Sequence, residues 1–286
     1  MTAGKKILVF GQSGQVATEL ATLEPDAIFL SRKEAELTDP AAVTVALERV
    51  GDISAIINAA AFTAVDQAEA EPDLVQTVNA TSVGVIAEHA AALNIPFVQI
   101  STDYVFDGSG VIPRGPDAAT GPLGIYGASK LAGEEAVRAA GGIHAILRTS
   151  WVFSAHGSNF LKTMLRLSED RTELSIVADQ IGGPTPAADI AQACLTLVEG
   201  LTTAPEKTGT YHFTGAPDVS WADFAREIFA VSGRQVEVHD ILTVAYPTPA
   251  TRPLNSRLDC STLEQQFGIA RPDWQAATRA IVGRLT

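Results

Sequence analysis

The sequence Ile7-Leu8-Val9-Phe10-Gly11-Gln12-Ser13-Gly14-Gln15-Val16-Ala17 predicts a buried strand, a tight glycine turn and the start of a helix. Gly11 permits the turn, and Gly14 removes a side chain so that backbone N–H groups can approach phosphate oxygens. Ala17 leaves room for the helix to pack on the strand. The pattern predicts a site for the pyrophosphate of a dinucleotide. An ordinary strand–turn–helix unit is the alternative, because the spacing is G-x-x-G-x-x-A.

Outward from this turn, short apolar runs alternate with longer helical patterns, which is typical of a parallel sheet covered by helices. The first half therefore predicts a doubly wound α/β (Rossmann) fold, whose buried parallel strands are apolar almost throughout. The expected strands are 7–10, 27–30, 55–58, 97–101 and 145–149, and the expected helices are 15–23, 40–50, 72–94 and 126–140.

After residue 150 the elements become shorter, and Gly182-Gly183-Pro184 is followed by a cluster of prolines between 247 and 253. This change predicts a smaller C-terminal α/β domain that binds the substrate. The expected helices of this half are 159–167, 187–199, 221–232 and 274–285, and the expected strands are 174–177, 211–214 and 236–240. We assign 1–150 and about 185–215 to the dinucleotide-binding domain, and about 151–184 and 216–286 to the substrate-binding domain.

The chain is acidic, because 20 Lys and Arg residues oppose 33 Asp and Glu residues among 286, which gives a net charge of −13. Such a field repels polyphosphate backbones and anionic membranes, so we expect neither nucleic acid nor a membrane as partner. Cys194 and Cys260 lie far apart without a CxxC motif and are expected to be reduced. We predict no signal peptide and no spanning segment, and therefore expect a cytoplasmic protein.

The turn after the second predicted strand reads Ser31-Arg32-Lys33, where many dinucleotide sites place an acidic residue for the adenine ribose. A hydroxyl and two cations suit a 2′-phosphate, and no carboxylate follows the strand directly. The sequence therefore predicts NADPH as the preferred cofactor, with NADH as the alternative. A solvated basic turn explains the same residues.

Tyr126 and Lys130 occupy positions i and i+4, so they share one face of the helix that this segment opens. A phenol titrates at about pH 10, and a neighbouring cation is expected to lower its pKa by favouring the phenolate. Thr102 and Asp103 follow the fourth strand, and the carboxyl ends of parallel strands are where such sheets bind ligands. The two fragments thus converge on one crevice. A helix surface on which Tyr and Lys fall four apart by chance is the alternative.

Together these residues resemble the extended short-chain dehydrogenase/reductase superfamily, which combines a glycine-rich turn, a Thr after the fourth strand and a Tyr-x-x-x-Lys pair. The likeness is closest to one of its families, the dTDP-4-dehydrorhamnose reductases, and covers nearly the whole chain. It is carried by residues 62–69, 78–80, the string Ser101-Thr102-Asp103-Tyr104-Val105-Phe106-Asp107-Gly108, 126–134, 148–153, Asn159-Phe160, Asp179-Gln180, 183–185, and Arg252-Pro253 with Ser256.

The resemblance implies reduction of the position-4 ketone of dTDP-4-dehydrorhamnose to dTDP-L-rhamnose, with hydride from NADPH or NADH. Tyr126 is then expected to donate a proton to the ketone oxygen and Thr102 a hydrogen bond, while Lys130 holds the nicotinamide ribose. The expected cofactor contacts are Gly11, Gly14, Gln15, Val16, Ser31, Arg32, Ala60, Ala61, Phe62, Tyr126 and Lys130. The expected substrate contacts are Thr63, Val65, Thr102, Asp103, Tyr104 and Trp151, with Arg252 as a candidate for the diphosphate.

Two other kinds of protein stay open on the sequence. A regulatory subunit that only binds a dinucleotide needs no proton donor, so the complete set of Thr102, Tyr126 and Lys130 argues against it. An epimerase or dehydratase of the same superfamily recycles its hydride, and a dehydratase usually carries two acids after the strand-four Thr, where Asp103 is followed by Tyr104. We predict no metal site, since the five histidines lack ligand spacing, and a homodimer stays open.

Overall fold

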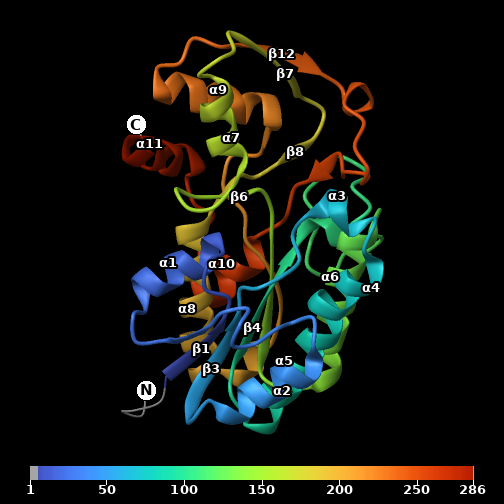
Figure 1. Ribbon diagram of the computed structural model, residues 1–286, viewed down its shortest axis with the longest axis vertical. Coiled ribbons are helices and arrows are strands. Elements are labelled where there is room, and N and C mark those ends of the chain that lie inside the picture. Colours follow the sequence, from blue (N-terminus) through green and yellow to red (C-terminus); the bar gives the residue numbers. More distant parts are fainter. Residues whose placement is uncertain (1–5, 286) are drawn as a thin grey trace.

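A computed structural model of the chain describes residues 6–285, which form a lower and an upper part (Figure 1). The lower part holds a sheet of six parallel strands in the order β10 (Gly209–His212), β5 (His144–Thr149), β4 (Phe97–Thr102), β3 (Ile53–Asn58), β1 (Lys6–Phe10) and β2 (Ile28–Leu30). The order in which successive strands are added to the sheet reverses at β1, because β2 lies on one side of β1 and β3 on the other. This is the switch point of a doubly wound sheet, so the predicted fold class is confirmed.

Both faces of the sheet are covered by helices, and successive side chains of each strand enter two different cores. On one face, α1 (Gln15–Leu23) and α8 (Ala187–Thr203) pack against Val9 and its neighbours. On the other face, Leu8 and Phe10 lie under the three helices α2 (Pro40–Arg49), α5 (Ser82–Ala92) and α6 (Ile125–Ala140). Burial on both faces is the reason why these strands are apolar almost throughout.

The helix expected over 72–94 is interrupted in the structure. α4 (Pro72–Gln76) runs into a π-helical turn, η1 (Thr77–Thr81), from which α5 continues. The prediction of one regular helix is therefore wrong at η1. A π-turn inserts one residue into the helical repeat without a local sequence signature, and such turns are frequent at functional sites.

The upper part has its own core, in which α7 (Phe160–Leu167), α9 (Trp221–Ser232) and α11 (Trp274–Leu285) pack beside the paired strands β7 (Glu173–Val177) and β12 (Glu237–Ile241). Two sets of short strands complete it. β6 (Val152–Phe153) pairs with β9 (Thr185–Pro186), and β8 (Ile181–Gly182) lies between β11 (Val219–Ser220) and β13 (Asn255–Ser256). The remaining short elements are α3 (Val65–Ala68), α10 (Ser261–Phe267), η2 (Asp103–Val105), η3 (Pro205–Lys207) and η4 (Thr243–Ala245).

The chain returns from the upper part to the lower sheet through α8 and β10, which lie within the range 185–215. The strand expected at 211–214 starts earlier and ends earlier, as β10. The assigned domain limits themselves stay a prediction, and residues 1–5 and 286 of those ranges lie outside the described residues.

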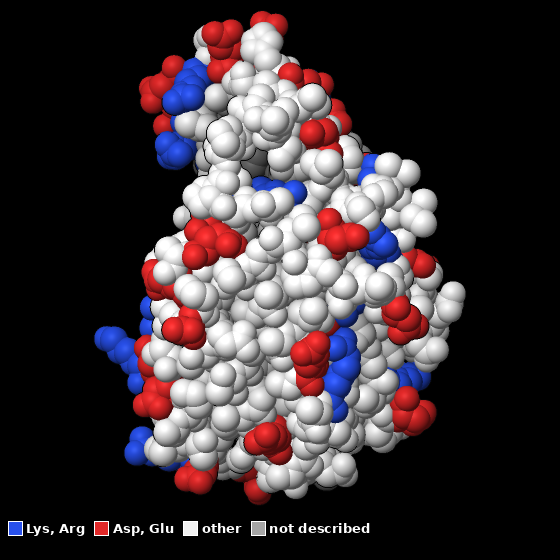
Figure 2. Space-filling model, turned by 90° about the vertical axis from the view of Figure 1, so that its right-hand side faces the viewer, with Lys and Arg blue, Asp and Glu red and all other residues white. Residues whose placement is uncertain are grey.

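Figure 2 shows the side of the molecule on which α3, α4 and α6 lie in Figure 1. Acidic and basic residues are interspersed there, and a hollow separates the upper from the lower part, with Lys or Arg atoms at its lower rim. Both cysteines are buried and carry free thiols. Between residues 6 and 285, the structure contains no helix with the length and apolarity needed to cross a bilayer.

Candidate active site

The glycine turn after β1 is shaped for close backbone approach. Gly11 has φ +105°, and a Cβ there would lie 3.4 Å from the backbone of Ala59 at the end of β3. Gly14 precedes α1, and no side chain caps that helix, which leaves the first backbone N–H groups of α1 for an anion. The uncapped N-terminus of α1 thus lies where the sequence predicts that Gly14, Gln15 and Val16 contact a dinucleotide pyrophosphate, which stays a prediction.

The side chain of Gln15 connects this turn with the upper part. Its Oε1 accepts hydrogen bonds from Ser154 Oγ and Asn159 Nδ2, both at 2.9 Å, and its Nε2 donates to the Val152 carbonyl oxygen at 3.4 Å. Gln15 is therefore both an expected cofactor contact and a link between the first turn of α1 and the segment from β6 to α7.

The end of β2 carries a carboxylate that the sequence interpretation missed. Glu34 Oε2 accepts hydrogen bonds from the Ser31 hydroxyl at 2.6 Å and the Ser31 backbone N–H at 2.9 Å. The side-chain hydrogen bond to Ser31 is the main cause that lowers the pKa of Glu34. Residues 31–33 carry no carboxylate, as expected, but the chain folds back after Leu30 and brings the carboxylate of Glu34 onto Ser31. Arg32 and Lys33 are exposed.

Asn79, in the π-helical turn η1, fixes the segment after β3. Its Oδ1 accepts from the Phe62 N–H at 2.9 Å, and its Nδ2 donates to the Phe62 carbonyl oxygen at 3.1 Å and to Ser129 Oγ at 3.0 Å. Phe62 and the preceding Ala60 and Ala61, all partly buried, are thereby held at the carboxyl edge of the sheet. The expected substrate contacts Thr63 and Val65 follow directly, at the start of α3.

Thr102 and Asp103 lie buried at the end of β4, where η2 begins. Thr102 Oγ donates to Asp103 Oδ1 at 3.0 Å and accepts from the Tyr104 N–H at 3.2 Å. Burial raises the pKa of Asp103 to about 6, against the opposing hydrogen bonds from Ser256 and Thr102. A carboxyl group with its pKa raised this far changes its protonation state in the weakly acidic pH range.

Tyr126 stands in the first turn of α6, beside Thr102. Gly127 lets α6 approach closely, because a Cβ at that position would collide with the Tyr104 carbonyl oxygen. The rings of Tyr104 and Tyr126 meet edge to face with centroids 5.5 Å apart. At the N-terminus of the helix, the Glu69 carboxylate accepts a hydrogen bond from the Ile125 N–H at 2.8 Å. The structure thus brings the expected hydroxyl donors together in one place.

The expected effect of Lys130 on Tyr126 is not seen. Burial raises the pKa of Tyr126 to about 12, the hydrogen bond between Tyr126 and Thr102 opposes this rise, and the charge of Asp103 adds to it. Lys130 is 4% exposed and its Nζ donates to the Ile100 carbonyl oxygen at 2.7 Å. The predicted lowering of the Tyr126 pKa by this ammonium is therefore wrong, since desolvation dominates both groups and lowers the pKa of Lys130 to about 8.

A buried ion pair supports the same helix. Glu134 is fully buried one turn after Lys130, and its carboxylate accepts Arg148 Nε at 2.8 Å and Nη2 at 2.6 Å. Ser101 Oγ and Arg138 Nη2 donate to the same carboxylate at 2.6 Å and 2.8 Å. Arg148 Nη1 also approaches His212 Nε2 at 3.3 Å. This network ties α6 to β4, β5 and the end of β10, and Glu134 partly offsets the fall in the Lys130 pKa.

Trp151 follows β5 in a left-handed backbone conformation, φ +50°, which a bulky residue adopts only where its surroundings enforce it. Its ring stacks on Trp221 with centroids 3.6 Å apart and planes 13° apart. Trp221 Nε1 donates to Gln180 Oε1 at 3.2 Å. Sequence reasoning missed Trp221, which covers one ring face of Trp151.

Arg252 is already paired. Its Nη2 donates to Asp66 Oδ2, on α3, at 2.8 Å, while Nη1 is buried and makes no hydrogen bond to any residue between 6 and 285. Asp66 also accepts the Ala250 N–H at 3.2 Å. The loop before β13 is thus fastened to the lower part, and the diphosphate contact expected of Arg252 stays a prediction.

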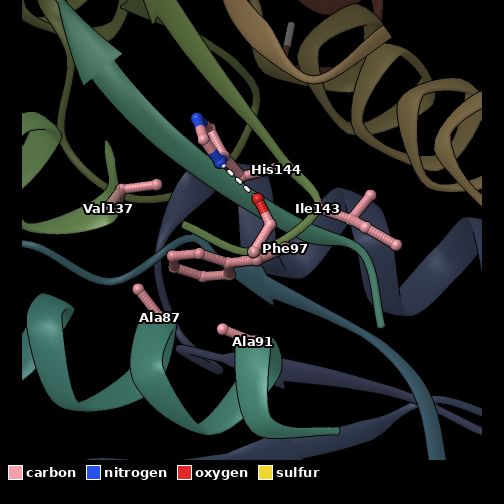
Figure 3. Close-up of a pocket in the computed structure, with 7 residues that line it drawn as sticks. Ala87, Ala91, Phe97, Val137, Ile143 and His144 are labelled. Atoms are coloured by element: carbon pink, nitrogen blue, oxygen red, sulfur yellow. Dashed lines mark hydrogen bonds between the residues drawn. The ribbon is translucent and has the colours of Figure 1, made fainter. Parts of the chain in front are cut away.

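A small cavity elsewhere does not belong to this site. It is lined by Ala87, Ala91, Val137, Phe97 and His144, at the amino ends of β4 and β5, and it leaves no room for a water molecule (Figure 3). His144 Nδ1 lies 2.7 Å from the Gly142 carbonyl oxygen there. The expected site residues lie at the opposite, carboxyl ends of the strands.

Among doubly wound proteins, a strand-four Thr that meets a Tyr-x-x-x-Lys pair at the carboxyl edge of the sheet marks the extended short-chain dehydrogenases/reductases, and this chain is of that class. The RmlD substrate binding domain family matches residues 5–286. A dTDP-4-dehydrorhamnose reductase of Sinorhizobium fredii is 44% identical over 290 residues, which cover 98% of this chain and 97% of that protein. The chain belongs to the dTDP-4-dehydrorhamnose reductase family.

Solved structures agree with this assignment. The crystal structure of a dTDP-4-dehydrorhamnose reductase from Clostridium acetobutylicum superposes with a TM-score of 0.90 at 34% identity, over 98% of this chain and 99% of that one. The dTDP-4-dehydrorhamnose reductase of Bacillus anthracis, solved in complex with NADP, superposes with a TM-score of 0.89 at 33% identity, over the same shares of the two chains.

Proposed function

We propose that this chain reduces the position-4 ketone of dTDP-4-dehydrorhamnose to dTDP-L-rhamnose, with NADPH or NADH as the reductant. The observation that carries the proposal is the meeting of Thr102 and Tyr126, with Lys130 one helical turn further, at the carboxyl end of β4. Family membership supports the substrate, since the named relatives are reductases of this sugar nucleotide. A homodimer and a cytoplasmic location stay predictions from the sequence.

The residues of the crevice fit a nicotinamide dinucleotide. Gly11, Gly14, Gln15 and Val16 would hold the pyrophosphate at the start of α1, and Lys130 the nicotinamide ribose. When bound, the reduced nicotinamide supplies hydride to the ketone carbon. The backbone contacts of Asn79 keep residues 60–62 in a fixed position beside that cleft.

Tyr126 is proposed as the proton donor. With its pKa raised to about 12, the phenol stays protonated at neutral pH and can give its proton to the oxygen on which negative charge develops. Lys130 donates to the Ile100 carbonyl oxygen and is fixed close to the helix turn that carries Tyr126. Thr102 is proposed as the second donor to the substrate oxygen.

The test is the variant Tyr126→Phe, which keeps the ring and removes the proton. We expect kcat to fall by about 10²–10⁴, while the Kd for NADPH changes little, because the hydroxyl acts on the ketone. NADPH absorbance and sugar conversion are measured together in the wild type. One NADPH oxidised per sugar reduced supports a reductase, whereas sugar conversion without net NADPH loss would identify an epimerase, and normal turnover by the variant would exclude Tyr126 as donor.

We propose NADPH as the preferred reductant. Ser31 and Arg32 offer a hydroxyl and a guanidinium to a 2′-phosphate, provided that the Ser31 hydroxyl leaves Glu34. The ratio of kcat/KM for NADPH to that for NADH is measured in the wild type, in Arg32→Ala and in Glu34→Gln. We expect the first variant to lower the ratio and the second to raise it; a ratio below one in the wild type would reverse the assignment.

A further inference from the structure

A buried carboxyl group lies directly behind the proposed hydroxyl donor. Asp103 is 2% exposed, and its Oδ1 accepts the Thr102 hydroxyl at 3.0 Å. Ser256, on β13 of the upper part, lies beside the same carboxyl group, yet Oδ2 makes no geometrically sound hydrogen bond within residues 6–285. In the described part of the chain, no Lys, Arg or His forms an ion pair with Asp103. Burial with so few hydrogen-bond partners destabilises the ionised carboxylate, so the environment favours protonation of Asp103.

The hydrogen bond from Thr102 to Asp103 determines whether Thr102 can donate to the substrate. A hydroxyl group has one proton to donate and two lone pairs to accept with. Thr102 accepts from the Tyr104 N–H and directs its only proton to Asp103. In this arrangement it can accept from Tyr126, but it cannot also donate to a ketone oxygen. Since an ionised carboxylate accepts hydrogen bonds only, it holds the Thr102 proton, whereas a carboxylic acid can itself donate.

We propose that Asp103 is a positioning residue that sets the direction in which Thr102 donates. When Asp103 is ionised, it keeps the Thr102 proton; when Asp103 is protonated, Thr102 is free to donate to the ketone oxygen of the substrate. Asp103 acts through Thr102 and needs no contact with the sugar. The proposal rests on the proposed function, because it assumes that Thr102 faces the reacting carbonyl.

The surroundings of Asp103 place this switch in an accessible pH range. Burial raises its pKa to about 6, and the hydrogen bond from Thr102 together with the nearby Ser256 hydroxyl keeps it from rising further. The titratable groups that feel its charge are Tyr104, on the same turn, and Tyr126, on α6. The charge of Arg252, on the loop before β13, opposes the rise that burial causes in the pKa of Tyr104, but its guanidinium is paired with Asp66. The second substrate donor therefore becomes available as the pH falls through about 6.

The experiment measures kcat/KM for dTDP-4-dehydrorhamnose, at saturating NADPH, between pH 5 and pH 9, in the wild type and in Asp103→Asn. We expect the wild-type value to fall about 10–100-fold as the pH rises through the Asp103 titration, which is the worth of one hydrogen bond to a charged group. Asp103→Asn has no ionisable group at this position, so its profile should lack that step.

Ser256→Ala is the matched control. It removes the neighbouring hydroxyl group that lowers the Asp103 pKa, so the step should remain and move to higher pH. Thr102→Val should lose the step and stay slow throughout, and adding Asp103→Asn to it should change little further. A structural role alone would lower all profiles without moving the step. Thermal unfolding and NADPH binding verify that each variant is folded.

A readout without turnover separates the two proposals. The infrared difference spectrum between pH 5 and pH 8, wild type minus Asp103→Asn, should contain one carboxylic acid band that titrates at about pH 6. Wild-type turnover with a profile that Asp103→Asn shares, or with no step at all, overturns the positioning role and leaves the proposed function standing. Absence of any reduction of the sugar by the wild type overturns the proposed function and, with it, this role of Asp103.

Discussion

Replacing Glu134 by Gln should destabilise the protein strongly, although the two side chains have nearly the same shape. Glu134 is fully buried, and Arg148, which it holds by two hydrogen bonds, is 2% exposed. The change leaves the Arg148 guanidinium buried without a counter-charge. It also places the amide N–H₂ group of the new glutamine against Ser101, Arg138 and Arg148, which are all donors. Removing one partner of such a pair costs about 3–5 kcal/mol. At about 2–4 °C per kcal/mol, Tm should fall by about 6–20 °C.

The assay is urea or thermal unfolding of both proteins at pH 7, with Arg226→Ala as the control. Arg226 is 42% exposed and pairs with Asp223 and Asp240 at the surface, so its loss should cost no more than about 1 kcal/mol. The double variant Glu134→Leu with Arg148→Met removes both charges and should recover part of the loss. A loss below about 1 kcal/mol in Glu134→Gln, or a double variant less stable than the single one, would refute the reasoning.

Three further outcomes follow from the site. Burial, and next the charge of Arg148, lower the pKa of His212 to about 3. Between about pH 6.5 and pH 3 the unfolded chain binds a proton at this histidine that the native state does not bind, so this group should lower the free energy of unfolding by about 1.4 kcal/mol for each pH unit of acidification. The variant His212→Asn should flatten this slope in urea titrations at a series of pH values. Gln15→Ala should weaken the mutual dependence of NADPH and dTDP affinities, which reciprocal calorimetric titrations measure; unchanged coupling would argue against the link. Arg252→Ala should raise KM for the sugar nucleotide about tenfold with kcat nearly unchanged, more than the control Asp66→Asn does.

The lower sheet could be predicted because its signals are local. The helix expected over 15–23 has the observed bounds, since Gly14 ends the turn before it and the apolar positions of the helix repeat regularly. Asp39 before Pro40 also caps α2, where its carboxylate accepts the N–H groups of Ala41 and Ala42. Two-residue strands such as β6 and β9 have no period of their own and are fixed by their pairing alone.

The sequence predicted which residues carry the reacting groups, but it did not predict how the fold shifts their pKa values. The spacing of Tyr126 and Lys130 reveals the pair, but only the fold shows that burial raises one pKa and lowers the other. Likewise, the contact of Glu34 with Ser31 depends on the conformation of a turn, which the residue types there do not determine. Trp221 contacts Trp151 from a helix seventy positions further along the chain, and such contacts between distant segments leave no pattern in one sequence.

The stacked indoles of Trp151 and Trp221 provide an intrinsic spectroscopic signal that reports on their surroundings. The chain contains three tryptophans, and the third, Trp274, is buried in the upper core. Two parallel rings at this separation couple their electronic transitions, so the near-ultraviolet circular dichroism of the protein should carry a paired band from them. A ligand that parts or tilts the rings will change this band while the signal of Trp274 stays constant, which allows occupancy to be followed without any label.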